Sequence, residues 1–224
     1  MQQALAKLNI VGVGPGSPDY VTPAARKAVQ QADVVIGAQR SLSLFTADIK
    51  GETMVLTAKN LNDALKHAAE STKSGKNVAL LSTGDPGFSG LLHTVLESGL
   101  FRGIDINVVA GVSSIQACAA RLNISWDNTR LFTFHDEVSE DEKEKLISAV
   151  KCGRTILLLP NSKGFAPKDI ASFLIKLDTD KKTPVYICEN ITLESERITQ
   201  STLEGVFGLS FGSLCVMVIK SNNE

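Results

Sequence analysis

The sequence has no cationic excess of the kind that marks nucleic-acid-binding proteins. Its 224 residues include 23 lysines and arginines against 24 aspartates and glutamates, a formal net charge of -1. Proteins that hold nucleic acid mainly through its phosphates usually carry a surplus of basic residues or a basic face. We therefore expect no nucleic acid among the partners of this protein.

Cysteine and histidine are also scarce. The three histidines are scattered, and no cysteine belongs to a CxxC pair, so the sequence predicts neither a metal site nor a redox motif. The four cysteines lie more than 25 residues apart, and we expect them to be small buried apolar residues: Cys118, Cys152, Cys188 and Cys215.

Long hydrophobic runs are missing. No segment approaches the roughly 20 apolar residues that span a bilayer. The first residues, MQQALAKLNI, lack a basic stretch followed by an unbroken apolar one, which is the pattern of a secretory signal. We therefore expect a cytoplasmic protein without a membrane partner.

What the chain does contain is an alternation of short apolar runs with longer helical patterns. The expected strands of the first half are continuously apolar, as is typical of parallel strands covered on both faces. In the second half, three expected strands follow one another closely, which favours antiparallel pairing in a mixed sheet. The sequence therefore predicts two α/β domains, residues 1–112 with a parallel sheet and residues 113–224 with a mixed sheet.

Several helix starts carry capping signals. Thr22 precedes Pro23 at the expected start of one helix, and Asn60 or Asn62 precedes another. In the second half, Ser139 and a glutamate three residues later form the pattern of a capping box. The stretch 40–45 (RSLSLF) is only a short mixed polar and apolar segment, without a clear assignment.

A glycine-rich loop, GVGPGSPD at residues 12–19, lies between an expected strand and an expected helix. Glycine allows a sharp turn and a close approach of a ligand to the backbone. Gly12, Gly14 and Ser17 nearly match a dinucleotide fingerprint, but Pro15 removes an N–H that would donate to a pyrophosphate. The acidic residue expected at the end of the second strand is also missing. A dinucleotide site is thus a weak interpretation, beside another small-ligand site and a tight turn without a ligand.

Two more segments follow expected strands, STGDPGFSG at residues 82–90 and AGVSSIQ at residues 110–116. Asp85 either caps the next helix or accepts hydrogen bonds from a ribose or an amine. Ser113 and Ser114 begin a helix, and one can cap it while the other faces a ligand. Because open parallel sheets bind ligands at the carboxyl ends of their strands, three such loops predict a small-ligand cleft.

In this order and spacing, the three segments resemble the tetrapyrrole methylases, enzymes that use S-adenosylmethionine to methylate corrin and siroheme rings. The GxGPG strand end and the helix ending in ADVVxG are similar to residues 12–37, the GDP loop to residues 82–90, and the PG[IV]SS segment to residues 110–114. Three later segments resemble the branch that methylates C-5 of cobalt-precorrin-7: RLFTFHD, the CEN of VYICEN, and SERITQSTLEG.

The resemblance implies a class III S-adenosylmethionine-dependent methyltransferase fold with the active-site cleft between its two α/β domains. It implies a C-methyltransferase of cobalamin biosynthesis, a homodimer, that acts on a polycarboxylate tetrapyrrole in which cobalt is possible. The chain ends at Glu224 without the fused decarboxylating domain of the aerobic relatives, so the resemblance is to the stand-alone type of the anaerobic route.

The resemblance also assigns site residues. It makes His135 and Glu189 candidate proton-handling residues, each of which is otherwise a structural polar residue at a strand end. The sequence departs from the family at Ala110, where the family has proline, and at Asp136, where glycine usually follows the histidine. Cofactor contacts fall by motif position on eight residues: Pro15, Gly84, Asp85, Phe88, Ser113, Ser114, Leu159 and Pro160.

The chemistry can be reasoned separately. A sulfonium methyl group is already electrophilic, and C-5 belongs to an electron-rich conjugated system, so alignment and exclusion of water are expected to dominate catalysis without a metal. A polycarboxylate substrate requires cations near it. Four residues are candidates, each of which is otherwise a solvated surface charge: Arg40, Lys59, Arg121 and Lys163.

Other functions remain open. Within the family, the alternatives are methylation at another ring position or of uroporphyrinogen, and a protein substrate as in diphthine synthesis is a more remote one. From other classes, a nucleotide-binding oxidoreductase or a non-catalytic binding module on an α/β scaffold is conceivable, because fold alone does not determine function.

Overall fold

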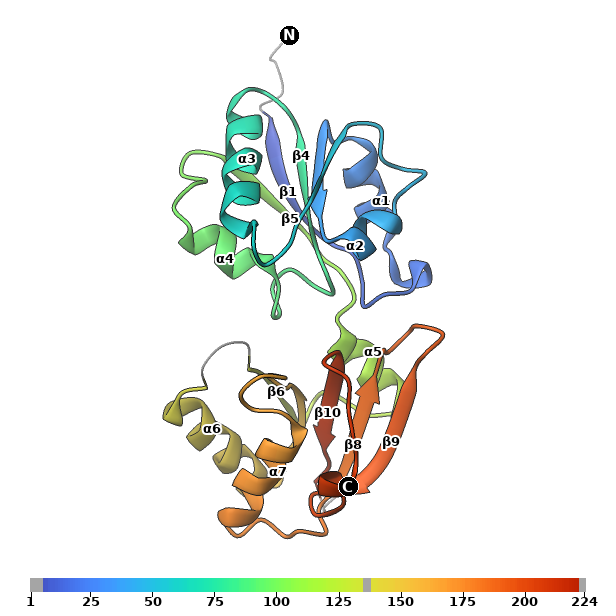
Figure 1. The fold of residues 1–224 in the computed structure, drawn as a ribbon, viewed down its shortest axis with the longest axis vertical. Helices are drawn as coiled ribbons and strands as arrows, with labels where there is room; N and C mark the ends of the chain where they lie inside the picture. The colour runs from blue at the N-terminus through green and yellow to red at the C-terminus, as the bar shows by residue number, and fades with distance from the viewer. Residues whose placement is uncertain (1–5, 135–137, 222–224) are drawn as a thin grey trace. The chain divides into compact units, whose positions relative to one another are not determined.

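The computed structural model describes residues 6–134 and 138–221. The chain divides into two compact units, residues 1–113 and residues 114–224, each with its own sheet and its own hydrophobic core (Figure 1). We describe each unit by itself. None of the helices in the described part of the chain combines the length and apolar character needed to cross a membrane.

The first unit is built on five strands that all run parallel. Their burial is nearly complete at the centre of the sheet, where β2 and β4 have no exposed residue. This matches the continuous apolar runs of the sequence, because both faces of these strands are covered. The strands lie in the order β3 (Glu52–Val55), β2 (Val34–Gly37), β4 (Val78–Ser82), β1 (Lys7–Gly12) and β5 (Asp105–Val109).

Helices cover both faces of this sheet, as Figure 1 shows. One face packs against α3 (Leu61–Lys73) and α4 (Leu91–Glu97), and the other against α1 (Pro23–Gln30) and α2 (Gln39–Ser43). A short 3₁₀ helix, η1 (Pro18–Tyr20), precedes α1. The first unit is therefore a three-layer α/β sandwich with two hydrophobic clusters, one on each side of the sheet.

The capping predictions hold for two of the three helices. The Thr22 hydroxyl accepts a hydrogen bond from Ala25 N at 3.1 Å at the start of α1, and Ser139 and Glu142 form the capping box of α6. Asn60 occupies the N-cap position of α3, but its side chain bonds to the preceding turn instead. The stretch 40–45 forms most of α2, a helix that its short pattern did not reveal.

The second unit contains a mixed sheet. Strands β6 and β7 are parallel, whereas β10 pairs antiparallel with both β7 and β8, and β8 pairs antiparallel with β9. The predicted mixed sheet is confirmed. The strands lie in the order β6 (Thr129–Thr133), β7 (Thr155–Leu159), β10 (Cys215–Ile219), β8 (Pro184–Glu189) and β9 (Arg197–Thr202).

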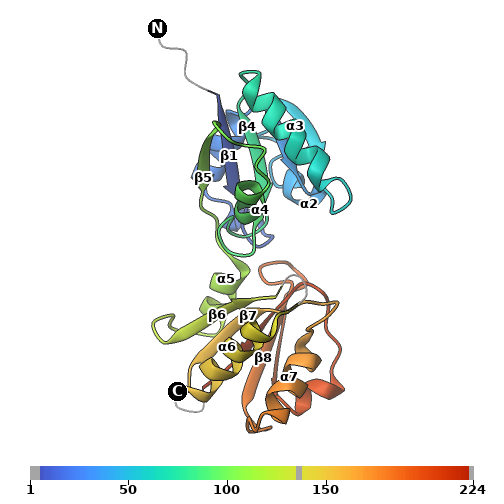
Figure 2. The ribbon, with the colours of Figure 1, turned by 90° about the vertical axis from the view of Figure 1, so that its left-hand side faces the viewer.

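Three helices and a 3₁₀ turn complete this unit. Helices α6 (Glu140–Lys151) and α7 (Pro167–Lys176) lie together over one face of the sheet in Figure 2. Helix α5 (Ser114–Arg121) contacts β7 and β10, and η2 (Gly205–Gly208) packs against α7 and β9. The core contains an aromatic group in which Phe134 meets Phe165 edge to face at 5.2 Å.

Candidate functional site

The three glycine-rich loops meet at one edge of the first unit. Strands β4, β1 and β5 are neighbours that run in the same direction, so their carboxyl ends share an edge of the sheet. The loops that follow them cover residues 13–17, 83–90 and 110–113. Strand topology therefore brings together three segments that lie up to about 100 residues apart in the sequence.

The first and second loops are joined through their backbones. Gly14 N donates to Gly84 O at 3.3 Å, and Gly84 N donates to Gly14 O at 2.8 Å, so that the two residues form an isolated antiparallel bridge. Both have positive φ, +83° for Gly14 and +71° for Gly84. Glycine is required at each, because other residues adopt this backbone conformation only at a cost.

The second and third loops also come into direct backbone contact. A Cβ added to Gly111 would lie 2.3 Å from Gly84 O and 2.7 Å from the Gly12 Cα. A Cβ added to Gly12 would lie 2.5 Å from Gly111 N. These separations leave no room for a side chain, so the glycines permit backbone packing that any larger residue would prevent.

Asp85 connects the second loop to the third. Its Oδ1 accepts a hydrogen bond from Gly87 N at 2.8 Å, and its Oδ2 accepts one from Gly111 N at 3.0 Å. The alternative that Asp85 caps the next helix is wrong, because Gly90 is the N-cap of α4 and the first helical N–H, that of Leu91, donates to Ser82 Oγ at 3.1 Å. A carboxylate has about four lone-pair directions, so both oxygens retain the capacity to accept from a ligand.

The remaining predicted cofactor residues of this unit lie in the same loops. Pro15 and Phe88 are half-buried, in the first and second loops, and Phe88 N donates to Asp85 O at 3.4 Å. Ser113 is buried at the end of the third loop, and its Cα would lie 3.7 Å from a Cβ at Gly84. Ser114 is the first residue of α5 and belongs to the second unit.

The first loop does not have the form of a pyrophosphate cradle. Val13 N donates to Ser82 O at 3.0 Å and Gly14 N donates to Gly84 O, which leaves these donors occupied, and Pro15 has no N–H. The loop leads into η1, and α1 begins only at Pro23. A dinucleotide fingerprint requires free loop donors and a helix N-terminus at the phosphates, so the geometry disfavours this alternative.

In the second unit, two predicted cofactor residues lie at the end of a strand. Leu159 ends β7 and Pro160 follows it, both half-buried. Leu159 O accepts a hydrogen bond from Phe134 N at 3.0 Å, so the chain beyond β6 lies against this strand end. Strands β6, β7 and β8 run in one direction, which places Glu189, at the end of β8, on the same edge of the mixed sheet.

Both oxygens of the Glu189 carboxylate are engaged within the protein. Glu189 is 4% exposed, its Oε2 accepts from Arg197 Nε at 2.7 Å, and its Oε1 accepts from Gly212 N at 2.7 Å. The ion pair with Arg197 and the hydrogen bond from Gly212 thus fix the position of this carboxylate. These contacts favour the structural interpretation of Glu189 over a proton-handling one. The other proton-handling candidate, His135, lies outside the described residues.

Comparison with known proteins agrees with this geometry. The family profile described as Tetrapyrrole (Corrin/Porphyrin) Methylases matches residues 7–206. The chain belongs to the tetrapyrrole methylase family. The resemblance seen in the three loop motifs is thus confirmed, and so is the α/β fold with a parallel and a mixed sheet.

Three similar proteins illustrate its relationships within the family. A probable cobalt-precorrin-7 C(5)-methyltransferase of Methanocaldococcus jannaschii is 38% identical over 216 residues, which is 96% of this chain and 98% of the relative. A uroporphyrinogen III methyltransferase of Methanosarcina barkeri, named as S-adenosyl-L-methionine-dependent, is 27% identical over 222 residues. The alignment covers 91% of this chain and 85% of the relative. The X-ray structure of a cobalt precorrin-4 methyltransferase matches with a TM-score of 0.81, 28% identity, and coverage of 96% of this chain and 94% of that one.

Ala110 stands before Gly111, where the resemblance expects proline, and the loop is anchored by the residues that follow. Gly111 N donates to Asp85 Oδ2, and the backbone of Gly111 packs against Gly12 and Gly84. The substitution therefore leaves this loop anchored through its glycine and the carboxylate. The other departure, Asp136, lies outside the described residues.

The four candidate cations differ in their surroundings. Arg121 Nε forms an ion pair with Glu196 Oε1 at 3.0 Å, and Lys163 lies in the loop between β7 and α7. Arg40 and Lys59 follow β2 and β3, so they lie at the same edge of the first sheet as the glycine loops. Arg40 Nη2 donates to Thr83 Oγ1 at 3.3 Å, and Thr83 is a residue of the second loop that the motifs alone did not mark.

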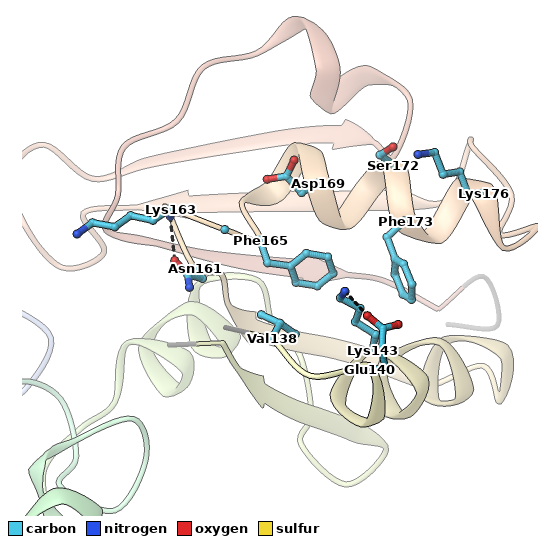
Figure 3. Close-up of a pocket in the computed structure, with 11 residues that line it drawn as sticks. Val138, Glu140, Lys143, Asn161, Lys163, Phe165, Asp169, Ser172, Phe173 and Lys176 are labelled. Carbon is cyan, nitrogen blue, oxygen red and sulfur yellow. Dashed lines mark hydrogen bonds and ion pairs between the residues drawn. The ribbon is translucent and has the colours of Figure 1, made fainter. Parts of the chain in front are cut away.

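Lys163 borders a cavity of about 660 Å³ between α6, α7 and the loop that joins β7 to α7 (Figure 3). Lys163 and Lys176 lie at opposite ends of this pocket, and Lys143 pairs with Glu140 at 2.7 Å. Phe165 and Phe173 lie between them and meet edge to face at 5.9 Å. The lysines of the pocket therefore do not converge on one point, and the pocket has no strong preference for an anion.

The expectation that all four cysteines are buried is wrong for Cys152, which is exposed. The other three are buried in the second unit, and Cys118 Sγ lies 2.9 Å from Cys188 Sγ without a disulfide bond. The hydrogen bond to Cys188 and burial raise the pKa of Cys118, and burial, with the nearby Glu189 carboxylate, raises the pKa of Cys215 to about 12. The thiols of Cys118 and Cys215 are thus held in their protonated, unreactive form.

Proposed function

We propose that this protein transfers a methyl group from S-adenosylmethionine to C-5 of cobalt-precorrin-7 during cobalamin biosynthesis. The observation that carries the proposal is the set of three interlocked glycine loops, within a chain that aligns almost end to end with the Methanocaldococcus jannaschii relative. The segments around Glu189 and Arg197, which resemble the C-5 branch, support the ring position.

The loops fit S-adenosylmethionine better than a phosphate-bearing cofactor. Bound S-adenosylmethionine would supply an electrophilic methyl group on a positively charged sulfonium. The three loops contain no lysine or arginine, and the second carries the Asp85 carboxylate. A cationic ligand is favoured by such surroundings, whereas a pyrophosphate is not. The close packing of Gly12, Gly84 and Gly111 brings the backbones of the three loops together with no side chain between them.

The proposal gives each of the candidate cofactor-binding residues a role. Asp85 fixes the second and third loops to each other, and its free lone pairs accept from the cofactor. Pro15 and Phe88 provide apolar surface that excludes water, and Ser113 lies beside Gly84 to offer a polar contact. Leu159 and Ser114, together with Pro160, are the contacts proposed from the second unit. Catalysis then rests on alignment of the methyl group with C-5 and on exclusion of water.

Proton transfer is a secondary part of the proposal. Attack by the electron-rich ring requires no strong base, but a proton is lost or moved afterwards. His135 is the proposed residue for this step. Glu189 is proposed instead to hold Arg197 and the chain around Gly212, because these contacts already use both of its oxygens.

Calorimetric titration with S-adenosylhomocysteine tests the cofactor, with NADH as the parallel control. The proposal expects binding of the first and none of the second. Binding of NADH alone would overturn the methyltransferase assignment. Incubation with S-adenosylmethionine and cobalt-precorrin-7 should then increase the mass of the corrinoid by one CH₂ unit, and NMR of the product should place the new methyl group at C-5.

Methylation at another ring position is the second candidate, favoured by the similarity to the cobalt precorrin-4 methyltransferase structure. The same assay with cobalt-precorrin-4 and with uroporphyrinogen III distinguishes the two. Turnover of either in preference to cobalt-precorrin-7 would replace the proposed regiochemistry and leave the cofactor assignment intact.

We further propose a cytoplasmic homodimer. The mixed sheet has two edge strands that expose apolar side chains, Leu131 on β6 and Ile198 on β9, and such edges favour association. Sedimentation equilibrium tests the dimer, and a mass of one chain at micromolar concentration would contradict it.

A further inference from the structure

Charged residues are unevenly distributed along the edge of the first sheet at which the carboxyl ends of its strands lie. Along this edge the loops follow the strand order β3, β2, β4, β1, β5. The three loops after β4, β1 and β5 contain no lysine or arginine, whereas the connections after β3 and β2 carry Lys59 and Arg40. The cations thus occupy one half of the edge, and the glycine loops, whose one charged residue is Asp85, occupy the other.

Arg40 lies where the two halves meet. It belongs to α2, directly after β2, and its Nη2 donates to Thr83 Oγ1 at 3.3 Å across to the neighbouring loop. Thr83 comes immediately before Gly84, and both Arg40 and Thr83 are exposed. The guanidinium is therefore positioned beside the loop in which the cofactor is proposed to bind.

The partner of Arg40 is neutral, which distinguishes it from the paired arginines. Arg26 contacts Asp48 at 2.7 Å and Arg121 contacts Glu196 at 3.0 Å, but Arg40 forms no ion pair with any residue in the described ranges. A guanidinium has five N–H donors in a planar fork that matches a carboxylate. The charge and most donors of Arg40 are thus available to a ligand.

We infer that Arg40, with Thr83, binds a carboxylate side chain of the tetrapyrrole and so helps to determine which substrate binds and how its ring is oriented. The inference rests on the proposed function. The Thr83 hydroxyl accepts from Arg40 and donates its own proton to the same carboxylate. Lys59 adds positive charge on the same side, which attracts the acidic rim of the ring toward the β2 and β3 half.

Kinetics of Arg40→Gln and Arg40→Lys test the inference in the full-length protein. Arg102→Gln is the matched control, because Arg102 is an exposed arginine of the same unit that lies between α4 and β5, at the amino edge of the sheet. Arg40→Gln should raise KM for cobalt-precorrin-7 about 10- to 100-fold, the loss expected for one charged hydrogen-bonding group. Its kcat and its affinity for S-adenosylhomocysteine should stay near the wild-type values.

Three further measurements test whether the charge of Arg40, its shape, or its contact with Thr83 matters. Arg40→Lys should fall between wild type and Arg40→Gln, because lysine retains the charge without the fork. Thr83→Val should raise KM by a smaller factor and show a smaller additional effect in the Arg40→Gln background, since the two residues act on one group. The control Arg102→Gln should match wild type in all three quantities.

The outcomes separate this inference from the proposed function. A wild-type protein that methylates cobalt-precorrin-7 while Arg40→Gln keeps its KM overturns the inference alone, as does a loss of S-adenosylhomocysteine affinity in Arg40→Gln equal to the rise in KM. If the wild type shows no turnover, equilibrium binding of uroporphyrin III, an octacarboxylate tetrapyrrole, replaces KM as the readout. Loss of that binding in Arg40→Gln supports the inference although the proposed function has failed, and absence of binding to the wild type overturns both.

Discussion

Substitution of Gly111 by alanine is the sharpest perturbation of the proposed cofactor site. The new Cβ would lie 2.3 Å from Gly84 O and 2.7 Å from the Gly12 Cα, and both are backbone atoms that cannot rotate away. Ordinary contact requires a separation larger by about 1 Å, so two of the three loops have to move apart. The hydrogen bond from Gly111 N to Asp85 would be distorted by the same movement.

The magnitude follows from these two effects. Overpacking against a rigid neighbour costs about 1–3 kcal/mol, and a lost hydrogen bond to a charged group adds about 1–2 kcal/mol. The sum of about 2–5 kcal/mol does not exceed the total stability of about 5–15 kcal/mol that a typical protein possesses, so the variant should still fold. Affinity for S-adenosylhomocysteine should fall at least about tenfold, because a displacement of 1 Å separates the proposed contacts.

Two further glycine substitutions make the assay a graded series. Gly208→Ala meets nothing within 4 Å, and Gly87→Ala meets only the Asp85 side chain, at 3.2 Å. Urea denaturation and calorimetry should therefore rank the damage as Gly111→Ala, then Gly87→Ala, then Gly208→Ala. The reasoning would be refuted if Gly111→Ala retained the stability and cofactor affinity of wild type. It would also be refuted if Gly208→Ala lost as much stability and affinity as Gly111→Ala.

Three other predictions follow from single carboxylates. Asp85→Ala should abolish S-adenosylhomocysteine binding while circular dichroism remains native, and unchanged affinity would remove Asp85 from the site. Hydrogen bonding to Gln30 holds the pKa of Asp48 below its ordinary value of 3.8, so the stability that Asp48 contributes is fully present above that pH and is lost as the pH falls further. The urea midpoint of Asp48→Asn should therefore lie below that of wild type at pH 7, and the gap should narrow as the pH falls below 3.8; a constant gap would contradict this. Glu189→Gln should lower stability by about 1–2 kcal/mol, because the buried carboxylate loses charged hydrogen bonds although its partner Arg197 is more than half exposed, and should leave turnover of the folded enzyme nearly intact; a loss of about 100-fold in kcat would restore Glu189 as a proton-handling residue.

Local signals in the sequence predicted many of the elements because they act over a few residues. Thr22 and Pro23 mark the start of α1, and Ser139 marks the start of α6, through contacts within one helical turn. Helix α2 was missed because its five residues, Gln39–Ser43, are too few to show a helical period. Its stability comes from packing of residues such as Leu42 against β2 and β4, which no local pattern records.

In the candidate site, too, some residues carry local sequence signals and others are brought together only by the fold. Motif order identified Gly84, Asp85 and Ser113, because a glycine or a carboxylate in a strand-to-helix loop has a recognisable local reason. Arg40 was one of four candidate cations, but nothing in the sequence paired it with Thr83, because their hydrogen bond spans 43 residues. The engagement of Glu189 by Arg197 was equally hidden, since it depends on the antiparallel register of β8 and β9.

The sequence by itself determined the class of this protein: the alternation of short apolar runs with helical patterns predicted a parallel sheet, the close succession of its last expected strands predicted a mixed sheet, and its loop motifs predicted the tetrapyrrole methylase family. Only the tertiary structure decided how those motifs act on one another. Strand order places Gly12, Gly84 and Gly111 in backbone contact and directs the two oxygens of Asp85 to Gly87 and Gly111. Contacts of this kind depend on distances between segments up to about 100 residues apart, which are set by the packing of the whole sheet and not by any local preference of the chain.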